Sequence, residues 1–191
     1  MQALSKHAND RFNSLAASIL PFVFVAKHDS HDQVKEPFQE TWNDNVGGSR
    51  AVALYLKEIL SMAEEHLDSP QWALKHTAAR SIADATMAVA SMTGDMDSTN
   101  AATLWPRLER ALGGKTWEGK EVVLYAFAKF VETSSKYWLA EQDVAKAIEK
   151  VSKHWQALSN HDRDVTVAVK LARGCRVAKF CGFVADTDVA T

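Results

Sequence analysis

Apolar residues recur at intervals of three and four positions along most of the chain, which is the spacing of one face of an α-helix. Strand signals are nearly absent, because alternating apolar and polar stretches joined by Asn-Gly or Asp-Gly turns do not occur. Interruptions of the helical spacing predict short turns near residues 68–71, 113–116 and 159–162. The pattern therefore predicts an all-α fold.

Residues that favour helix ends predict where individual helices begin and stop. Pro21 is expected to end or kink the first helix, because proline lacks the backbone N–H that a helix interior uses. Ser49 is expected to open one continuous helix. Ser69 and Thr116 are the expected N-caps of two later helices. Two further stretches predict helices nearer the end of the chain, at about residues 141–158 and 162–183.

One segment of the sequence recurs with an offset of 45 residues. Residues 67–75 and 112–120 share Leu, Trp and Lys at corresponding positions, and 112 − 67, 117 − 72 and 120 − 75 all give 45. The match continues into the next apolar stripe, where Ile82 corresponds to Phe127. A third, degenerate copy ends its helix at Leu158, and 158 − 112 gives 46.

This period is typical of two-helix repeats of the HEAT and armadillo type, which recur every 40–47 residues or so. Such repeats cannot bury a core alone and stack into a solenoid. The 191 residues hold about four repeats of this length. We therefore expect a HEAT-like α-solenoid of antiparallel helix pairs, in one continuous stack over residues 1–191.

Composition narrows the function classes. The chain is 47% apolar with only 4 Pro and 8 Gly, which indicates an ordered globular protein. A formal net charge of −2 gives no basic excess for nucleic acid or an anionic membrane. The longest apolar run, residues 19–26, is too short to span a bilayer, and the first residues do not have the pattern of a signal peptide. Cys175 and Cys181 are expected to be free thiols in a reducing compartment.

Two stretches have residues that could bind a ligand, but neither has a complete pattern. His28 and His31 stand among aspartates, yet zinc needs three or four rigidly held ligands, so a solvated turn is favoured. Residues 113–116 end in Gly-Lys-Thr like a nucleotide-binding loop, but the upstream glycine and the preceding strand are missing. We therefore expect no catalytic residue, no cofactor and no metal.

The repeated tryptophans and lysines are the candidate partner-binding residues. Trp72 and Trp117 begin the second helix of their repeats, where an aromatic residue either fills the gap between repeats or anchors a partner. The first reading is favoured, and it predicts that both are largely buried. Lys75 and Lys120 follow three residues later, close to the same face, as solvated charges or as contacts for an acidic partner.

The first helix lacks the polar face that normally caps a solenoid. Its apolar residues include Leu15, Phe22 and Phe24. We therefore expect an exposed apolar surface at this end and self-association of the isolated chain.

Four ordered segments also resemble a known family: residues 19–28, 41–48, 54–59 and 111–121. The first is similar to a leucine-proline-aromatic helix ending in histidine, and the second to a tryptophan helix followed by an Asn-Val-x-Gly turn. The most specific match is the last segment, which contains Trp117. These motifs resemble the large proteasome-associated HEAT-repeat scaffold family, over about residues 8–158 of the chain.

The resemblance implies a piece of the C-terminal repeat region of a far longer, non-catalytic protein. Members of this family bind the 26S proteasome in the cytoplasm and nucleus, bridge its core and regulatory particles, and take part in assembly quality control. The matched motifs look architectural, so the resemblance assigns no partner-binding residue. It weakens after about Asp164.

Two other classes compete with this interpretation. A helical-repeat adaptor for another assembly, such as a transport receptor or a phosphatase scaffold, would share the same fold. A helical enzyme would need a convergent polar pocket, which the sequence does not indicate.

Overall fold

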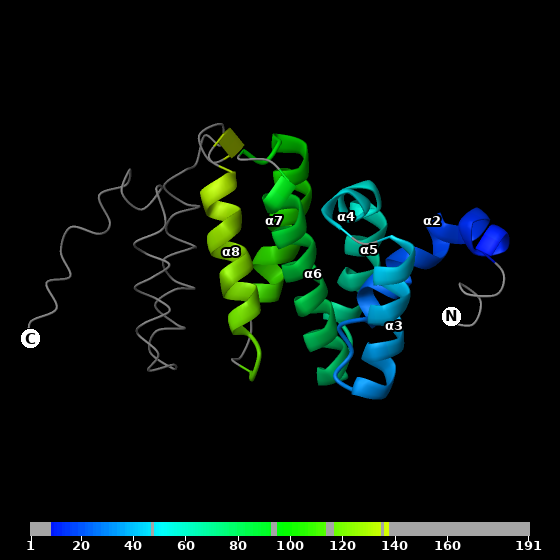
Figure 1. Cartoon of the computed structure of the whole chain (residues 1–191). Helices are drawn as coiled ribbons and strands as arrows, with labels where there is room; N and C mark the ends of the chain where they lie inside the picture. The colour runs from blue at the N-terminus through cyan, green and yellow to red at the C-terminus, as the bar shows by residue number, and fades with distance from the viewer. Residues whose placement is uncertain (1–8, 47, 93–94, 114–116, 135, 138–191) are drawn as a thin grey trace, which may run out of the picture.

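The computed structural model describes residues 9–46, 48–92, 95–113, 117–134 and 136–137. Within them the chain is all-helical, with seven helices and no strand, so the predicted fold class is confirmed for this part (Figure 1). The helices are α2 (Asn9–Ala26), α3 (Asp32–Asn45), α4 (Ser49–Leu54), α5 (Leu56–Leu67), α6 (Trp72–Met92), α7 (Ser98–Leu112) and α8 (Glu121–Thr133). The helices expected at 141–158 and 162–183 lie outside the described residues.

Helix α6 is the centre of the packing. It is the longest of the described helices, and it contacts α2, α4, α5, α7 and α8 (Figure 1). Its buried side chains are mostly small, which allows neighbouring helices to approach closely: Thr77, Ala78, Ala79, Ser81, Ile82, Ala83, Ala85, Thr86, Val89 and Ala90. Alanine also has the highest intrinsic helix propensity, so the same residues favour the helix and its packing.

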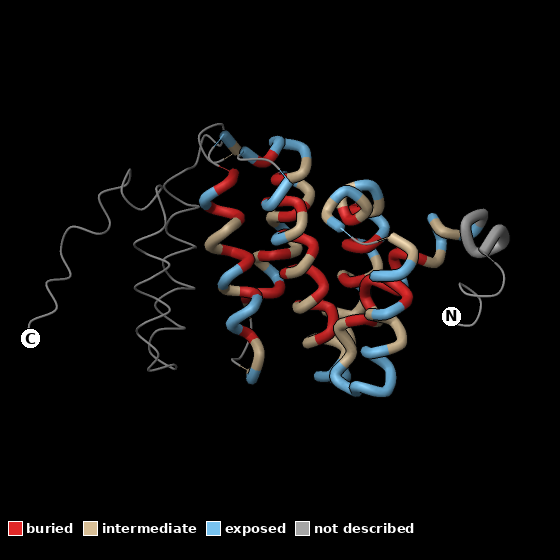
Figure 2. The backbone as a smooth tube through the Cα atoms, in the orientation of Figure 1, coloured by how far each residue is buried: buried red, intermediate tan, exposed pale blue. Residues whose placement is uncertain are grey.

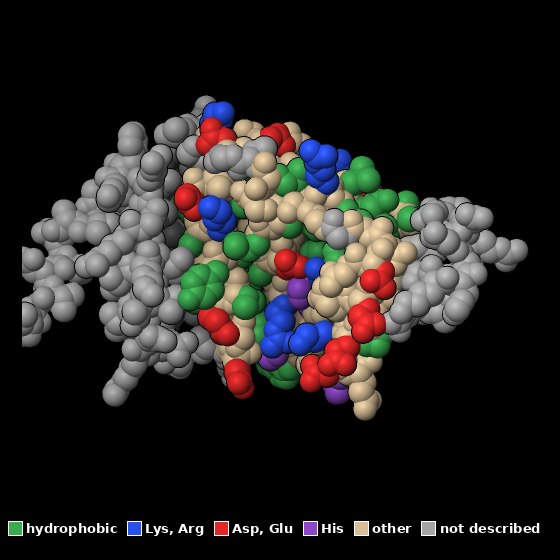
Figure 3. Space-filling model, in the orientation of Figure 1, with side chains coloured by type: hydrophobic (Ala, Val, Ile, Leu, Met, Phe, Trp, Pro, Cys, Tyr) green, Lys and Arg blue, Asp and Glu red, His purple; other side chains and the backbone are tan. Residues whose placement is uncertain are grey.

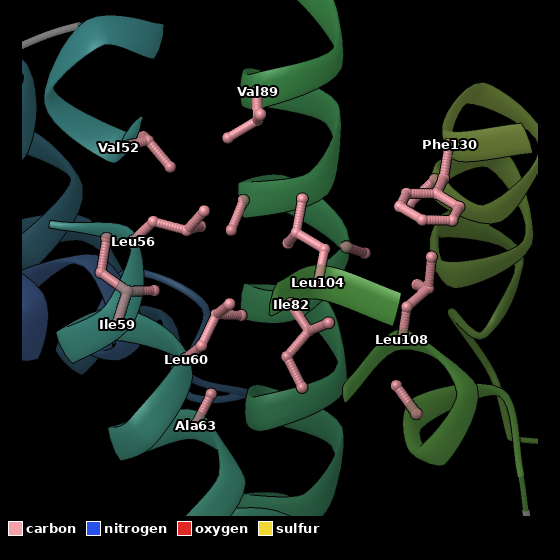
Figure 4. Close-up of a cluster of buried hydrophobic side chains, with 14 of the residues drawn as sticks. Val52, Leu56, Ile59, Leu60, Ala63, Ile82, Val89, Leu104, Leu108 and Phe130 are labelled. Carbon is pink, nitrogen blue, oxygen red and sulfur yellow. The ribbon is translucent and has the colours of Figure 1, made fainter. Parts of the chain in front are cut away.

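The core lies between α6 and the helices on either side of it. Figure 2 shows buried residues on the facing sides of these helices and exposed residues on their outer sides. Larger apolar side chains fill the space that the small residues of α6 leave, and Figure 4 shows them: Val52, Leu56, Ile59 and Leu60 from α4 and α5, Leu104 and Leu108 from α7, and Phe130 from α8.

The structure corrects two expectations about helix ends. Of the end or kink expected at Pro21, the end is wrong, because helix α2 continues to Ala26, and the residues that follow the proline, Val23 and Phe24 among them, are completely buried. Their burial outweighs the single backbone hydrogen bond that proline removes. The helix expected from Ser49 is divided at Tyr55, which has φ −104° and ψ 19°. The apolar spacing continues across this break, so the sequence pattern does not reveal it.

The turn expected at 68–71 is confirmed, because α5 ends at Leu67 and α6 begins at Trp72. Ser69 Oγ accepts a hydrogen bond from the N–H of Gln71 at 3.1 Å, before the helix rather than inside its first turn. Helix α8 begins at Glu121, later than an N-cap at Thr116 would place it, and Thr116 itself lies outside the described residues.

Candidate protein-interaction site

A pocket of about 280 Å³ lies where α5 and α7 end and α6 begins. Its lining comes from these three helices and from the turn before α8: Leu67, Asp68, Trp72, Lys75, His76, Ala79, Arg110, Ala111, Gly113 and Trp117. We call it the α6 pocket. It brings together three of the four candidate residues, Trp72, Lys75 and Trp117, while Lys120 does not line it.

Trp72 lies at the surface of this pocket with 59% of its area exposed. The expectation that it is buried between repeats is therefore wrong. Trp72 is the first residue of α6, whereas the buried stripe of that helix begins one turn later, at Thr77. Lys75 Nζ lies 5.2 Å from the centroid of the Trp72 ring, a cation–π distance. The two side chains thus share a face, as the spacing predicted.

Trp117 has a different environment, although it occupies the corresponding sequence position. It is half-buried, and its indole stacks on the ring of His76 with centroids 4.1 Å apart. The guanidinium carbon of Arg80 lies 5.2 Å from the same indole. Both partners belong to α6, so Trp117 packs against a neighbouring helix, and its intermediate exposure agrees with the expectation that it is largely buried.

A glycine shapes the turn that holds Trp117. Gly119 has φ +97°, in the region that favours glycine. A Cβ there would lie 2.9 Å from a guanidinium nitrogen of Arg80 and 3.1 Å from the Trp117 ring. The turn at 117–120 therefore delays the start of α8, which is why Trp117 lies before its helix whereas Trp72 begins its own.

Lys120 is not the exposed basic residue that was expected. It is only 3% exposed, and its Nζ donates a hydrogen bond to the carbonyl of Gly113 at 3.1 Å. Burial lowers the pKa of its ammonium group. Gly113 ends α7, so Lys120 satisfies a backbone carbonyl at a helix C-terminus and links α7 to the start of α8. Lys120 is therefore unavailable to a partner, and the expectation of a contact for an acidic partner applies to Lys75 alone.

The charges around the α6 pocket are unevenly paired. Arg110 contacts Asp68 at 2.6 Å and Glu64 at 2.5 Å, and Arg107 contacts Glu64 at 3.2 Å. This network joins α5 to α7 and balances two guanidinium groups with two carboxylates. Within the described part of the chain, Lys75 contacts no carboxylate. Lys75 therefore gives the pocket a positive charge that no residue of the lining neutralises.

His76 contributes an unsatisfied polar atom to the pocket wall. Its Nε2 is shielded from solvent and has no hydrogen-bond partner among the described residues. Burial, and secondarily the charge of Arg80, lower the pKa of His76, so its ring is neutral at neutral pH. Figure 3 shows Lys, Arg and His side chains near the middle of one face with an acidic side chain beside them, and further acidic side chains to either side.

A second polar cluster joins α2 to α6. Asp84 accepts a hydrogen bond from His28 Nε2 at 3.1 Å and contacts Lys27 Nζ at 2.7 Å. The solvated turn that was expected holds for His31, which is exposed, but not for His28, which lies mostly inside. No local motif indicates this cluster, because its members are 56 residues apart. The described residues contain no group of three or more His, Cys, Asp or Glu that could hold a metal.

Among the described helices, the α6 pocket combines two tryptophan rings with a lysine that contacts no described carboxylate. None of the described helices combines the length and apolar character needed to cross a bilayer.

The sequence is 28% identical over 142 residues, or 71% of the chain, to the human "Proteasome adapter and scaffold protein ECM29". It is 22% identical over 152 residues, or 79% of the chain, to the "Proteasome component ECM29" of Saccharomyces cerevisiae. A fission yeast relative, "Proteasome component ecm29" of Schizosaccharomyces pombe, is 26% identical over 134 residues.

The chain therefore contains an ECM29-like region, and the resemblance noted in the sequence is confirmed. It spans only 7–8% of the length of these curated relatives. No family model matches the sequence. No solved structure matches it either.

Proposed function

We propose that this chain is a non-catalytic, HEAT-like segment of a proteasome adaptor or scaffold. The observation that carries the proposal is the similarity to four curated ECM29 proteins, whose names describe a proteasome adapter, component or associated protein. The relation extends over 66–79% of this chain. In this proposal the chain provides a binding surface and catalyses no reaction.

The helix packing supports the solenoid that the proposal requires. Helix α6 contacts α8, and α5 contacts α7, so each helix touches the one that the 45-residue offset makes its counterpart. The corresponding residues Ile82 and Phe127 are both buried. A four-residue connection between α5 and α6 also favours opposite directions for this pair. We extend this arrangement to a single stack of about four repeats over residues 1–191.

Within a larger protein, such a segment would help to bridge the core and regulatory particles of the proteasome or to take part in its assembly quality control. It would act where proteasomes are found, in the cytoplasm and nucleus. Trp72, which is exposed, and the partly exposed Lys75 beside it are the residues of the α6 pocket that we assign to a proteasome subunit.

Affinity capture tests the proposal directly. The tagged chain is expressed in cells, captured after mild cross-linking, and its partners are quantified by mass spectrometry against a tag-only control. We expect proteasome subunits to be enriched. Enrichment of transport or phosphatase subunits instead would assign the chain to another class of helical-repeat adaptor and would overturn the proteasome assignment.

A further inference from the structure

We propose that the α6 pocket binds an acidic peptide segment of a protein partner, which inserts one apolar side chain beside Trp72 and places a carboxylate at Lys75. This inference rests on the proposed function in that it names the chemistry of the partner at the same site. It is argued from the size, the walls and the charge of the pocket.

The size of the pocket fits one large side chain. Small-molecule and cofactor sites are typically about 300–1,000 Å³ and enclose most of the ligand. The α6 pocket holds about 280 Å³, which is enough for one large side chain with part of its backbone. A peptide partner gains affinity by placing one anchor side chain in a preformed pocket.

The walls of the pocket are aromatic and largely fixed. The ring of His76 and the guanidinium group of Arg80 hold Trp117 in place, so one side of the pocket is already formed before a partner binds. Trp72 is the exposed wall, with 59% of its area open to solvent. Covering an indole of this kind removes a large apolar surface from water, and tryptophan is among the residues that contribute most to protein interfaces.

The charge of the pocket selects an acidic segment. Arg110 is already paired with Asp68, so the charge available to a ligand is that of Lys75. Two tryptophans could also enclose a cation, but the positive charge of Lys75 beside Trp72 would repel it. Asp68 is the sole carboxylate of the lining, and Arg110 occupies it. An acidic residue next to the apolar anchor would instead pair with Lys75 and complement the pocket.

The test uses the full chain labelled with ¹⁵N and two acetylated peptides, each with one phenylalanine between pairs of glutamates or pairs of lysines. The indole N–H signals of Trp72 and Trp117 are assigned with the variants Trp72→Phe and Trp117→Phe. We expect the glutamate peptide to shift both signals in a saturable manner and the lysine peptide to leave them unchanged. Selective binding of the lysine peptide, or no saturable shift with millimolar glutamate peptide, would overturn the proposal.

Charge reversal separates the pocket from a general electrostatic effect. Lys75→Glu should weaken binding of the glutamate peptide at least about tenfold, while Lys57→Glu makes the same charge change at an exposed position on α5 and should leave it within about twofold. Equal effects of the two variants would contradict a specific role for Lys75. Affinity capture reports separately on the proposed function: peptide binding without proteasome enrichment would defeat the proteasome assignment alone, whereas enrichment without peptide binding would defeat this inference alone.

Discussion

The imidazole of His76 stacks on the indole of Trp117 with centroids 4.1 Å apart and planes 12° from parallel. His76 belongs to α6, whereas Trp117 belongs to the turn that precedes α8, so this stack links α6 to the segment that leads into α8. Trp72, its counterpart 45 residues earlier, is exposed beside the same pocket. One tryptophan therefore supports the structure and the other faces solvent, which gives the two residues separable roles.

The first prediction follows from this difference. Trp117→Ala should lower the free energy of unfolding by roughly 2–4 kcal/mol, somewhat less than the loss expected for a fully buried tryptophan. For a chain of this size that corresponds to about 5–10 °C in melting temperature. Trp72→Ala is the matched control and should change the melting temperature by no more than about 2 °C, because most of its ring is already in water. Thermal unfolding followed by far-ultraviolet circular dichroism measures both; equal shifts would contradict the assignment.

The second prediction concerns the turn at Gly119. Gly119→Ala should destabilise the chain by roughly 2–3 kcal/mol, because the new methyl group adds close contacts with the stacked Trp117 ring and with Arg80 to the strain of a positive φ. Gly48→Ala is the matched control, since Gly48 has φ +111° but no atom within 4 Å of an added Cβ. It should show the backbone strain alone, about 1 kcal/mol. Urea unfolding of the two variants measures the difference. A Gly48 variant as unstable as the Gly119 variant would show that these contacts add nothing.

The third prediction is a loss of stability in acid. Burial acts to raise the pKa of Asp84, but the hydrogen bond from His28 and the charge of Lys27 outweigh it and lower this pKa to about 2. A carboxyl group whose pKa is depressed on folding stabilises the native state above its ordinary pKa, and this stabilisation is lost as the pH falls from about 4 to about 2. Burial lowers the pKa of His28 as well, so protonation of His28 begins to destabilise the fold below about pH 6.5.

Asp84→Asn tests this assignment. The variant should lose roughly 1–3 kcal/mol at pH 7, because Lys27 is left buried without its carboxylate, and the partial exposure of Asp84 keeps the loss below that of a fully buried pair. Its stability should also depend less on pH between about 4 and 2 than that of the unchanged chain. Urea unfolding at a series of pH values measures both effects. Parallel pH curves for the two proteins would show that Asp84 is not the responsible group.

How much of the fold and of the site could be predicted from the sequence depends on how far apart in the chain the interacting residues lie. The helical class and the turn at 68–71 follow from local spacing and were predicted. The different environments of Trp72 and Trp117 were not, because the two segments match in sequence while a positive φ at Gly119 shifts the start of α8. The contact of His28 with Asp84 depends on how α2 packs on α6, and no local pattern indicates it.

The last prediction concerns the apolar surface of α2. Leu15 is 49% exposed and Phe22 is 46% exposed, and seven residues of separation place them on one side of the helix. Phe24, in contrast, is buried in the core, so the expected surface is smaller than the sequence indicated. Because exposed apolar groups on one face promote association, we expect the isolated chain to form dimers whose population rises with concentration.

Leu15→Glu should shift this equilibrium to the monomer by at least about tenfold, as a charge at an apolar contact is unfavourable. Leu54→Glu, at a still more exposed apolar position on α4, is the control and should leave the equilibrium unchanged. Size-exclusion chromatography with light scattering measures the masses, and a monomer at every concentration would count against an association surface on α2.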